Sequence, residues 1–366
     1  MQEVSQAAPA PKKDERAKKL IQGVVSLLLI GAVFFYALPK IADFSEVWGS
    51  IRAMSPLEIG TLIFAALWNI ITYWFVIVAS LPGSNVWQAM KVNQASTAVA
   101  NTLPGGGALG LGVTFGMFSG YGFSRSEISL SVLVSGIWNN FVKLGMPIIA
   151  LAALAVSGGA SPGLMSAAVV GVIVLVGAIL VFSATLRSDA LARKVGDGLA
   201  HVANPVRRLL RKPPVQGWGE SAVGFRSKTV TLLHDRWVRL TVATLVSHFS
   251  LYLVLLLALR HVGVSQSEVG WAEVLAAFAF VRLISALPIT PGGLGVVELG
   301  LTAALVAAGG NEPQVVASVL IYRALTYLLP IPLGAALYLK WKKGAEARRL
   351  RLAQSSPTPG VAGKVS

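Results

Sequence analysis

The sequence predicts an all-α polytopic membrane protein, with six full spans and two broken re-entrant or double-crossing segments arranged as inverted repeats. Hydrophobic residues make up 54% of the 366 residues, and charged residues make up only 13%. Apolar runs of about 20 residues, the length of helix that crosses a bilayer, recur along the chain. Two other apolar stretches, one in each half of the chain, are interrupted by proline and glycine.

The six full spans are predicted from apolar runs that carry few charges. They cover residues 20–38, 57–79, 128–156, 164–185, 238–259 and 314–339. The first run follows a basic stretch and so resembles a signal peptide. It lacks the small-residue cleavage pattern of such peptides, and we therefore expect it to remain as a span.

The two broken segments cover about 92–120 and 271–308. Their helix-breaking residues are Pro104, Gly105, Gly106, Pro291, Gly292 and Gly293. Proline removes a backbone donor and glycine tolerates left-handed dihedral angles, so each site should end one helix and begin another. At membrane depth, irregular backbone persists only where it is buried in protein or lines a wet cavity. A re-entrant hairpin and two short crossings both fit each segment.

The basic residues predict the topology. The net charge is +15, and residues 1–19 hold five Lys or Arg, residues 186–239 hold eleven and residues 340–351 hold six. The opposite loops hold only Lys40, Arg52 and Arg260. By the positive-inside rule, the N-terminus (1–19), the central loop (186–237) and the tail (340–366) are cytoplasmic. The charge therefore indicates a multi-pass protein of the inner (plasma) membrane, with no nucleic-acid partner.

The central loop shows near-helical spacing of apolar residues, from Leu191 and Val195 to Leu209, with basic residues set among them. This pattern is typical of a helix that lies on an anionic membrane surface. A solvated linker with incidental charges is the alternative. Pro213 and Pro214 should end the helix.

The two halves of the chain align with a shift of 183 positions. The shift places Gly110 and Gly112 on Gly293 and Gly295, and Pro147 on Pro330. Repeat one would cover about 57–185 and repeat two about 238–339. Because the equivalent spans 128–156 and 314–339 run in opposite directions, the repeats would be inverted, an architecture that places a binding site near the bilayer midplane.

A longer motif carries a resemblance to a known family. It runs from Ser285 to Glu298, with the letters SALPITPGGLGVVE, and is followed by LIYRALTYLLP at 320–330. Over about residues 20–340 the chain resembles the lysylphosphatidylglycerol synthase transmembrane-region family. The resemblance implies oppositely oriented re-entrant helices and lipid translocation. Only a short polar stretch follows the last span, whereas full-length synthases of that family carry a soluble transferase domain, so we expect no enzyme activity.

Charges inside the spans are the candidate binding residues. A charge at the bilayer centre costs about 2.5 to 3.5 kcal/mol, so Lys143 should face protein or water, and Glu298 should pair with Arg282 or Arg323. On the repeat alignment Asn140 matches Arg323, one turn before Lys143, so cations from both halves could bind a phosphate headgroup. Half-helix N-termini at the breaks would add donors. The alternative is that these charges only lock the fold through buried pairs.

The sequence leaves three functions open. The first is flippase-like translocation of a phospholipid or another phosphate-bearing lipid, with membrane lipids as partners and a homodimer as one assembly left open. The second is a scaffold for envelope lipid synthesis, and the third is a proton-coupled transporter of a small anion that uses Glu298 or His248. The chain has no cysteine and its four histidines show no ligand spacing, so no metal or cofactor is expected.

Overall fold

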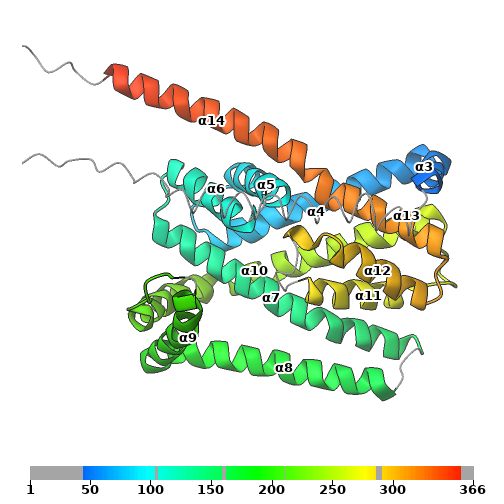
Figure 1. Ribbon diagram of the computed structural model, residues 1–366, viewed down its shortest axis with the longest axis horizontal. Coiled ribbons are helices and arrows are strands. Elements are labelled where there is room, and N and C mark those ends of the chain that lie inside the picture. The colour runs from blue at the N-terminus through cyan, green and yellow to red at the C-terminus, as the bar shows by residue number, and fades with distance from the viewer. Residues whose placement is uncertain (1–43, 104–105, 159–161, 210, 286–290, 356–366) are drawn as a thin grey trace, which may run out of the picture.

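The structure is a computed structural model that describes residues 44–103, 106–158, 162–209, 211–285 and 291–355, and every regular element in these ranges is a helix (Figure 1). The α-helices are α3 Phe44–Ala53, α4 Pro56–Ser80, α5 Val86–Thr102, α6 Gly106–Gly120, α7 Arg125–Val156, α8 Pro162–Arg187, α9 Asp189–Leu209, α10 Trp218–Val262, α11 Trp271–Ile284, α12 Val296–Ala307, α13 Glu312–Arg323 and α14 Pro330–Ser355. A 3₁₀ turn η2, Pro291–Gly293, precedes α12, and a π-helical turn η3, Ala324–Leu328, joins α13 to α14.

Five helical segments are long and apolar enough to cross a membrane. They are Pro56–Ser80, Arg125–Val156, Val169–Arg187, Trp218–Val262 and Glu312–Gly344. Each contains or overlaps a predicted span, so five of the six predicted spans are present as helices of membrane-spanning length. The predicted span 20–38 lies outside the described residues.

Capping boxes fix where two of these helices begin. The Ser55 hydroxyl accepts from the Glu58 backbone, and the Glu58 carboxylate accepts from the Ser55 backbone N–H at 2.7 Å. Ser124 and Glu127 repeat the arrangement at the start of α7. Each box satisfies two backbone donors that a helix start leaves free.

The first broken segment is a helical hairpin. Helix α5 ends at Thr102 and α6 begins at Gly106, as predicted for a break in this segment. A Cβ on Gly106 would collide with the Ala100 carbonyl, and one on Gly110 would lie 2.8 Å from the Ser96 oxygen. Contacts between residues further along α6 and earlier in α5 show that the two helices run antiparallel, and glycine lets their backbones approach closely. Pro104 and Gly105 lie outside the described residues.

The second broken segment also folds back on itself. Helix α11 ends at Ile284, and Gly292, Gly293 and Gly295 have φ angles of 63°, 69° and 80° before α12 begins. These positive φ angles explain the glycines, because other L-residues are strained there. Gly300 of α12 faces Val281 of α11 in the same antiparallel manner.

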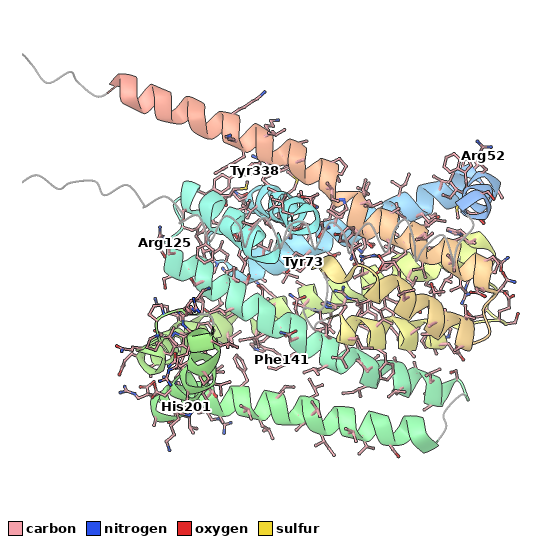
Figure 2. The ribbon with its side chains drawn as sticks, in the orientation of Figure 1. Arg52, Tyr73, Arg125, Phe141, His201 and Tyr338 are labelled. Atoms are coloured by element: carbon pink, nitrogen blue, oxygen red, sulfur yellow. The ribbon has the colours of Figure 1, made fainter. Side chains whose placement is uncertain are left out.

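Each hairpin packs against a long helix from the other half of the chain. Helix α5 packs on α14, while α11 packs on α7, and α4 lies along α10. Residues Gln94 and Ala98 of α5 meet Gly334 of α14, where a side chain would collide with the α5 backbone. In Figure 1 the α5–α6 hairpin and the α11–α12 hairpin lie toward opposite ends of the bundle. Arg125 and His201 lie toward one end and Arg52 toward the other (Figure 2).

Two helices of the bundle, α10 and α14, extend further than the hydropathy pattern predicts, and the central loop is also helical. The helix predicted from Leu191 is present as α9 and packs on α10 at Gly196, whose missing side chain makes room for the Trp218 carbonyl. Helix α10 begins at Trp218 rather than near residue 238, and α14 continues to Ser355 rather than ending near residue 339. Hydropathy marks the apolar part of a helix, whereas backbone hydrogen bonding continues through polar residues.

Candidate functional site

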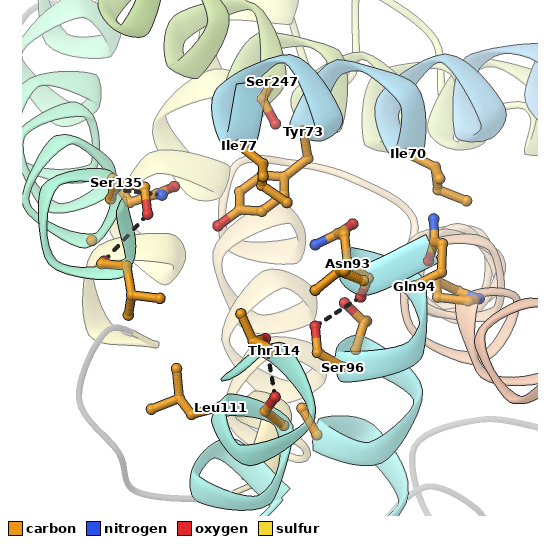
Figure 3. Close-up of a pocket in the computed structure, with 18 of the residues that line it drawn as sticks. Ile70, Tyr73, Ile77, Asn93, Gln94, Ser96, Leu111, Thr114, Ser135 and Ser247 are labelled. Atoms are coloured by element: carbon orange, nitrogen blue, oxygen red, sulfur yellow. Dashed lines mark hydrogen bonds between the residues drawn. The ribbon is translucent and has the colours of Figure 1, made fainter. Parts of the chain in front are cut away.

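A polar cavity of about 510 Å³ lies among α4, α5, α6, α7 and α10, with Arg282, Thr326 and Pro330 completing its lining. Figure 3 shows Tyr73 and Ile77 on one side of this space and Asn93, Ser96 and Thr114 on the other. The polar groups of the lining are mainly neutral amides and hydroxyls: Asn69, Asn93, Gln94, Ser96, Thr97, Thr114, Ser131, Ser135, Asn139, Ser247 and Thr326. Such a lining is unusual among apolar helices and marks a candidate binding site.

Helix α7 contributes a polar stripe to the cavity. Ser131, Ser135 and Asn139 are four residues apart, so they lie on one helix face, and all three line the cavity. Lys143 is the next residue at this spacing and is half-buried one turn further along the same face. Lys143 and Arg282 lie within electrostatic range of each other. The stripe therefore continues from the cavity lining to a cation.

Helix α5 supplies the opposite wall. Its Asn93, Gln94, Ser96 and Thr97 line the cavity. The antiparallel hairpin brings them beside Thr114 of α6 (Figure 3). Sequence reasoning missed these residues because it searched for charges, although a cluster of neutral polar residues in an apolar segment was visible.

Arg282 is the one Asp, Glu, Lys or Arg side chain that lines the cavity in the described part of the chain. Its Nε is buried and has no hydrogen-bond partner among the described residues. Within the same ranges, no ion pair forms between Arg282 and an acidic residue. A buried guanidinium nitrogen without an acceptor is costly, so this half-buried side chain is suited to an anionic group from outside the protein.

Glu298 instead pairs with Arg323. The Arg323 Nε donates to Glu298 Oε1 at 2.7 Å, and the two side chains are only 13% and 5% exposed. Glu298 Oε2 accepts from the Gly295 backbone N–H at 2.8 Å, and Arg323 also donates to the Gly292 carbonyl at 3.2 Å. Of the two partners that the sequence left open for Glu298, the structure selects Arg323. The pair ties α13 to the second break.

Tyr327 connects the two breaks. Its hydroxyl donates to the Asn101 carbonyl at 2.7 Å, and the Asn101 amide donates to the Tyr327 carbonyl at 3.1 Å. The guanidinium of Arg323 lies 4.5 Å from the centre of the Tyr327 ring, and the ring occupies the space that a side chain on Gly292 would need. One side chain in a π-helical turn thus contacts the end of α5 and the loop before α12.

The other predicted site residues are placed as follows. Asn140 is exposed on α7 and does not line the cavity, whereas its neighbour Asn139 does. Gly106 packs against α5, and Pro291 and Gly293 belong to the turn before α12. The structure brings Lys143 near Arg282 and holds Arg323 against Glu298. Their roles in binding substrate remain predictions.

A second hollow, of about 700 Å³, lies between α7, α8 and α10 and is almost wholly apolar. Trp138, Phe141 and Phe182 contribute aromatic rings to it, with centroids 5.6 to 6.0 Å apart. It lacks the convergent polar groups of the first cavity. A polar ligand therefore fits the cavity around Arg282 better than it fits this apolar hollow.

Apolar helices of membrane-spanning length define the protein as an integral membrane protein, and two helical hairpins and a polar cavity lie within its bundle. The chain belongs to the family described as the lysylphosphatidylglycerol synthase TM region, which matches residues 23–334 and confirms the resemblance in the motif from Ser285. No curated protein matches the chain. The family name links this membrane domain to a lipid-related function.

Proposed function

We propose that the protein translocates a phosphate-bearing lipid across the membrane in the manner of a flippase. The observation that carries the proposal is the polar cavity inside an apolar bundle, with Arg282 in its lining and no acidic partner for it among the described residues. A headgroup in this cavity would exchange water for amides, hydroxyls and a guanidinium while its acyl chains stay in the bilayer. The protein itself performs no synthesis in this proposal and needs no cofactor.

The architecture that suits this function is a pair of inverted repeats with re-entrant hairpins. The reciprocal packing of α5 on α14 and of α11 on α7 supports it, as do the positions of the hairpins toward opposite ends of the bundle. In such an arrangement, the cavity lies between the repeats and opens to either side in turn. We place the protein in the inner (plasma) membrane, with both termini and α9 on the cytoplasmic side.

The scaffold alternative is weaker on the same observations. A protein that only recruits partners has no need for a cavity of about 510 Å³ or for a cavity-lining arginine whose buried Nε has no partner in the described ranges. The small-anion transporter shares the cavity and differs in its substrate. A comparison of the transport of a soluble anion, such as inorganic phosphate, with the transport of labelled lipids distinguishes these two functions.

Leaflet exchange in liposomes tests the proposal. The purified full-length chain is reconstituted with labelled anionic, zwitterionic and cationic lipids, and exchange is followed by quenching of the outer label. We expect acceleration for at least one phosphate-bearing headgroup, and no uptake of inorganic phosphate. The absence of acceleration for every headgroup would overturn the translocase proposal.

Three variants locate the path. Asn139→Ala and Lys143→Ala should reduce the rate of lipid exchange by about tenfold or more while the protein stays at normal abundance. Each change removes a polar group that would bind the headgroup in place of water. Asn140→Ala is the matched control on the same helix, and its exposed side chain predicts unchanged exchange. If Lys143→Ala exchanges lipid at the full rate and Asn140→Ala does not, the polar stripe of α7 is not the path.

A further inference from the structure

Two buried nitrogen atoms at the cavity have no hydrogen-bond partner in the described residues. They are Arg282 Nε and His248 Nε2, and both side chains contribute to the cavity lining. Buried polar atoms of this kind are rare in proteins because each lost hydrogen bond costs free energy. Two of them in one cavity indicate what a ligand has to supply.

The two atoms require opposite partners. Arg282 can only donate, so it requires an acceptor, and a phosphate oxygen is the acceptor that a guanidinium binds best. His248 Nδ1 lies 3.0 Å from the Thr244 carbonyl oxygen, which can only accept, so Nδ1 carries a proton. In the neutral imidazole Nε2 is then an acceptor and requires a donor, such as a hydroxyl group.

Three hydroxyl groups of the lining are, like His248 Nε2, acceptors that require a donor from a ligand. Ser96 donates to the Asn93 carbonyl, Thr114 to the Gly110 carbonyl and Ser135 to the Val132 carbonyl. Their protons are therefore used within their own helices (Figure 3), and their oxygen atoms keep lone pairs that can accept from a ligand in the cavity. The cavity thus presents one charged donor together with neutral amides and with hydroxyl oxygen atoms that can accept.

This arrangement disfavours a cationic headgroup. No Asp or Glu lines the cavity in the described ranges, and the neighbouring Lys143 adds a second positive charge to that of Arg282. Between Leu20 and Ala42 and between residues 286 and 290 the sequence contains no acidic residue either. An ammonium group would enter a site with two cations nearby and no carboxylate to balance them.

We propose that the substrate class is a phosphodiester lipid whose headgroup carries free hydroxyl groups, a glycerol- or sugar-type headgroup, and that aminoacylated, cationic lipids are excluded. This inference rests on the proposed function for its translocation step and on the cavity alone for its selectivity. The Arg282 guanidinium binds the phosphate, and His248 Nε2 accepts from a headgroup hydroxyl. The selectivity is therefore opposite in charge to the lysylated lipid in the family name.

Lipid binding tests this inference independently of transport. The full-length protein in detergent is offered four lipids with identical acyl chains: phosphatidylglycerol, phosphatidylmethanol, phosphatidylcholine and lysyl-phosphatidylglycerol. Retention is measured by native mass spectrometry. Phosphatidylmethanol has the charge of phosphatidylglycerol but no free hydroxyl, so it isolates the hydroxyl contribution. We expect phosphatidylglycerol to bind about tenfold more tightly than phosphatidylmethanol or phosphatidylcholine, and lysyl-phosphatidylglycerol to bind most weakly.

Two substitutions assign the contacts. Arg282→Gln should weaken binding of all the lipids and reduce the preference for phosphatidylglycerol over phosphatidylcholine to the part that the hydroxyl contact supplies. His248→Phe should abolish the preference for phosphatidylglycerol over phosphatidylmethanol and leave the charge-based part of the preference over phosphatidylcholine. Arg193→Ala, on α9 and away from the cavity, is the control and should leave all preferences unchanged. A melting curve for each variant verifies that it remains folded. If Arg282→Gln or His248→Phe unfolds, the four-lipid series on the unsubstituted protein decides alone.

The outcomes separate the two proposals. Binding of lysyl-phosphatidylglycerol as tight as that of phosphatidylglycerol overturns the substrate class, even if liposome exchange is accelerated. Equal binding of phosphatidylmethanol and phosphatidylglycerol overturns the hydroxyl contact. Selective binding without accelerated exchange supports the substrate class and contradicts the translocase.

Discussion

Arg323 and Arg282 both lie in the second half of the chain, but their surroundings differ, and so do the roles that we expect for them. Arg323 has a carboxylate at 2.7 Å, a backbone carbonyl at 3.2 Å and an aromatic ring at 4.5 Å. These contacts hold α13, η3 and the loop before α12 together. For Arg282 Nε, by contrast, the described residues supply no acceptor. The contacts of Arg323 therefore stabilise the fold, whereas Arg282 is the arginine that the proposed function uses for ligand binding.

Removal of Arg323 should destabilise the protein rather than only inactivate it. Arg323→Ala leaves the Glu298 carboxylate buried without its partner, at a cost of about 3 to 5 kcal/mol. The additional change Glu298→Gln should recover part of that loss, because it removes the unpaired charge. Membrane abundance and melting temperature measure the cycle.

The control for this cycle is the exposed pair Arg193–Glu220, whose side chains are 52% and 69% exposed. Loss of such a pair costs about 1 kcal/mol or less. A normal melting temperature for Arg323→Ala together with a loss of transport would contradict the structural role. It would indicate instead that Arg323 binds the substrate.

At the scale of elements, close packing between glycine-bearing helices determines the shape of the site. The α5–α6 hairpin holds Asn93 and Ser96 opposite the polar face of α7 only because α6 approaches the α5 backbone at Gly106 and Gly110. Association of helices within a membrane depends on such contacts, since lipid supplies no hydrophobic driving force between them. The hairpin is therefore the element on which the cavity most depends.

Gly106→Ala should open this hairpin. The added methyl group would collide with the Ala100 backbone, where the carbonyl oxygen, the carbonyl carbon and the Cα all lie too close for a Cβ, so α5 and α6 would have to move apart. We expect a loss of about 1 to 3 kcal/mol and reduced lipid exchange. Gly112→Ala is the control in the same helix, because nothing lies within 4 Å of a Cβ placed there. Its effect should be neutral or slightly stabilising, since alanine favours a helix. Equal melting temperatures for the two variants would contradict the packing argument.

At the scale of the molecule, the basic helix α9 and the start of α10 lie together at one end of the bundle (Figure 1). Figure 2 shows Arg125 and His201 toward the end that carries the basic helix α9, and Arg52 toward the other end. By the positive-inside rule, we expect this end, with the basic residues of α9 and of the start of α10, to face the cytoplasm.

Cysteine labelling tests the sidedness, and the chain contains no native cysteine to interfere. Single cysteines at Ser50, Ser161 and Asn311 should react with an impermeant reagent added from outside, and cysteines at Ser126 and Gly217 should react only after the membrane is opened. External labelling at Ser126 would rule out a first hairpin that enters from the cytoplasm.

Local patterns in the sequence determined a large part of the architecture. Apolar runs predicted five spans that are present as helices, and the proline and glycine clusters predicted the interruptions between α5 and α6 and between α11 and α12. The motif from Ser285 predicted the family. These features depend on neighbouring residues, because span length, backbone freedom and the lack of a donor are properties of a short segment.

The tertiary structure alone decided which residues meet. The sequence left Glu298 with two possible partners, and packing of α13 against the second break selected Arg323. It favoured Asn140, yet Asn139 lines the cavity, because one residue turns a helix by about 100° and the choice depends on how α7 is rotated against its neighbours. The wall from α5 was hidden because neutral amides and hydroxyls become a binding surface only when folding brings separate helices together around the same space.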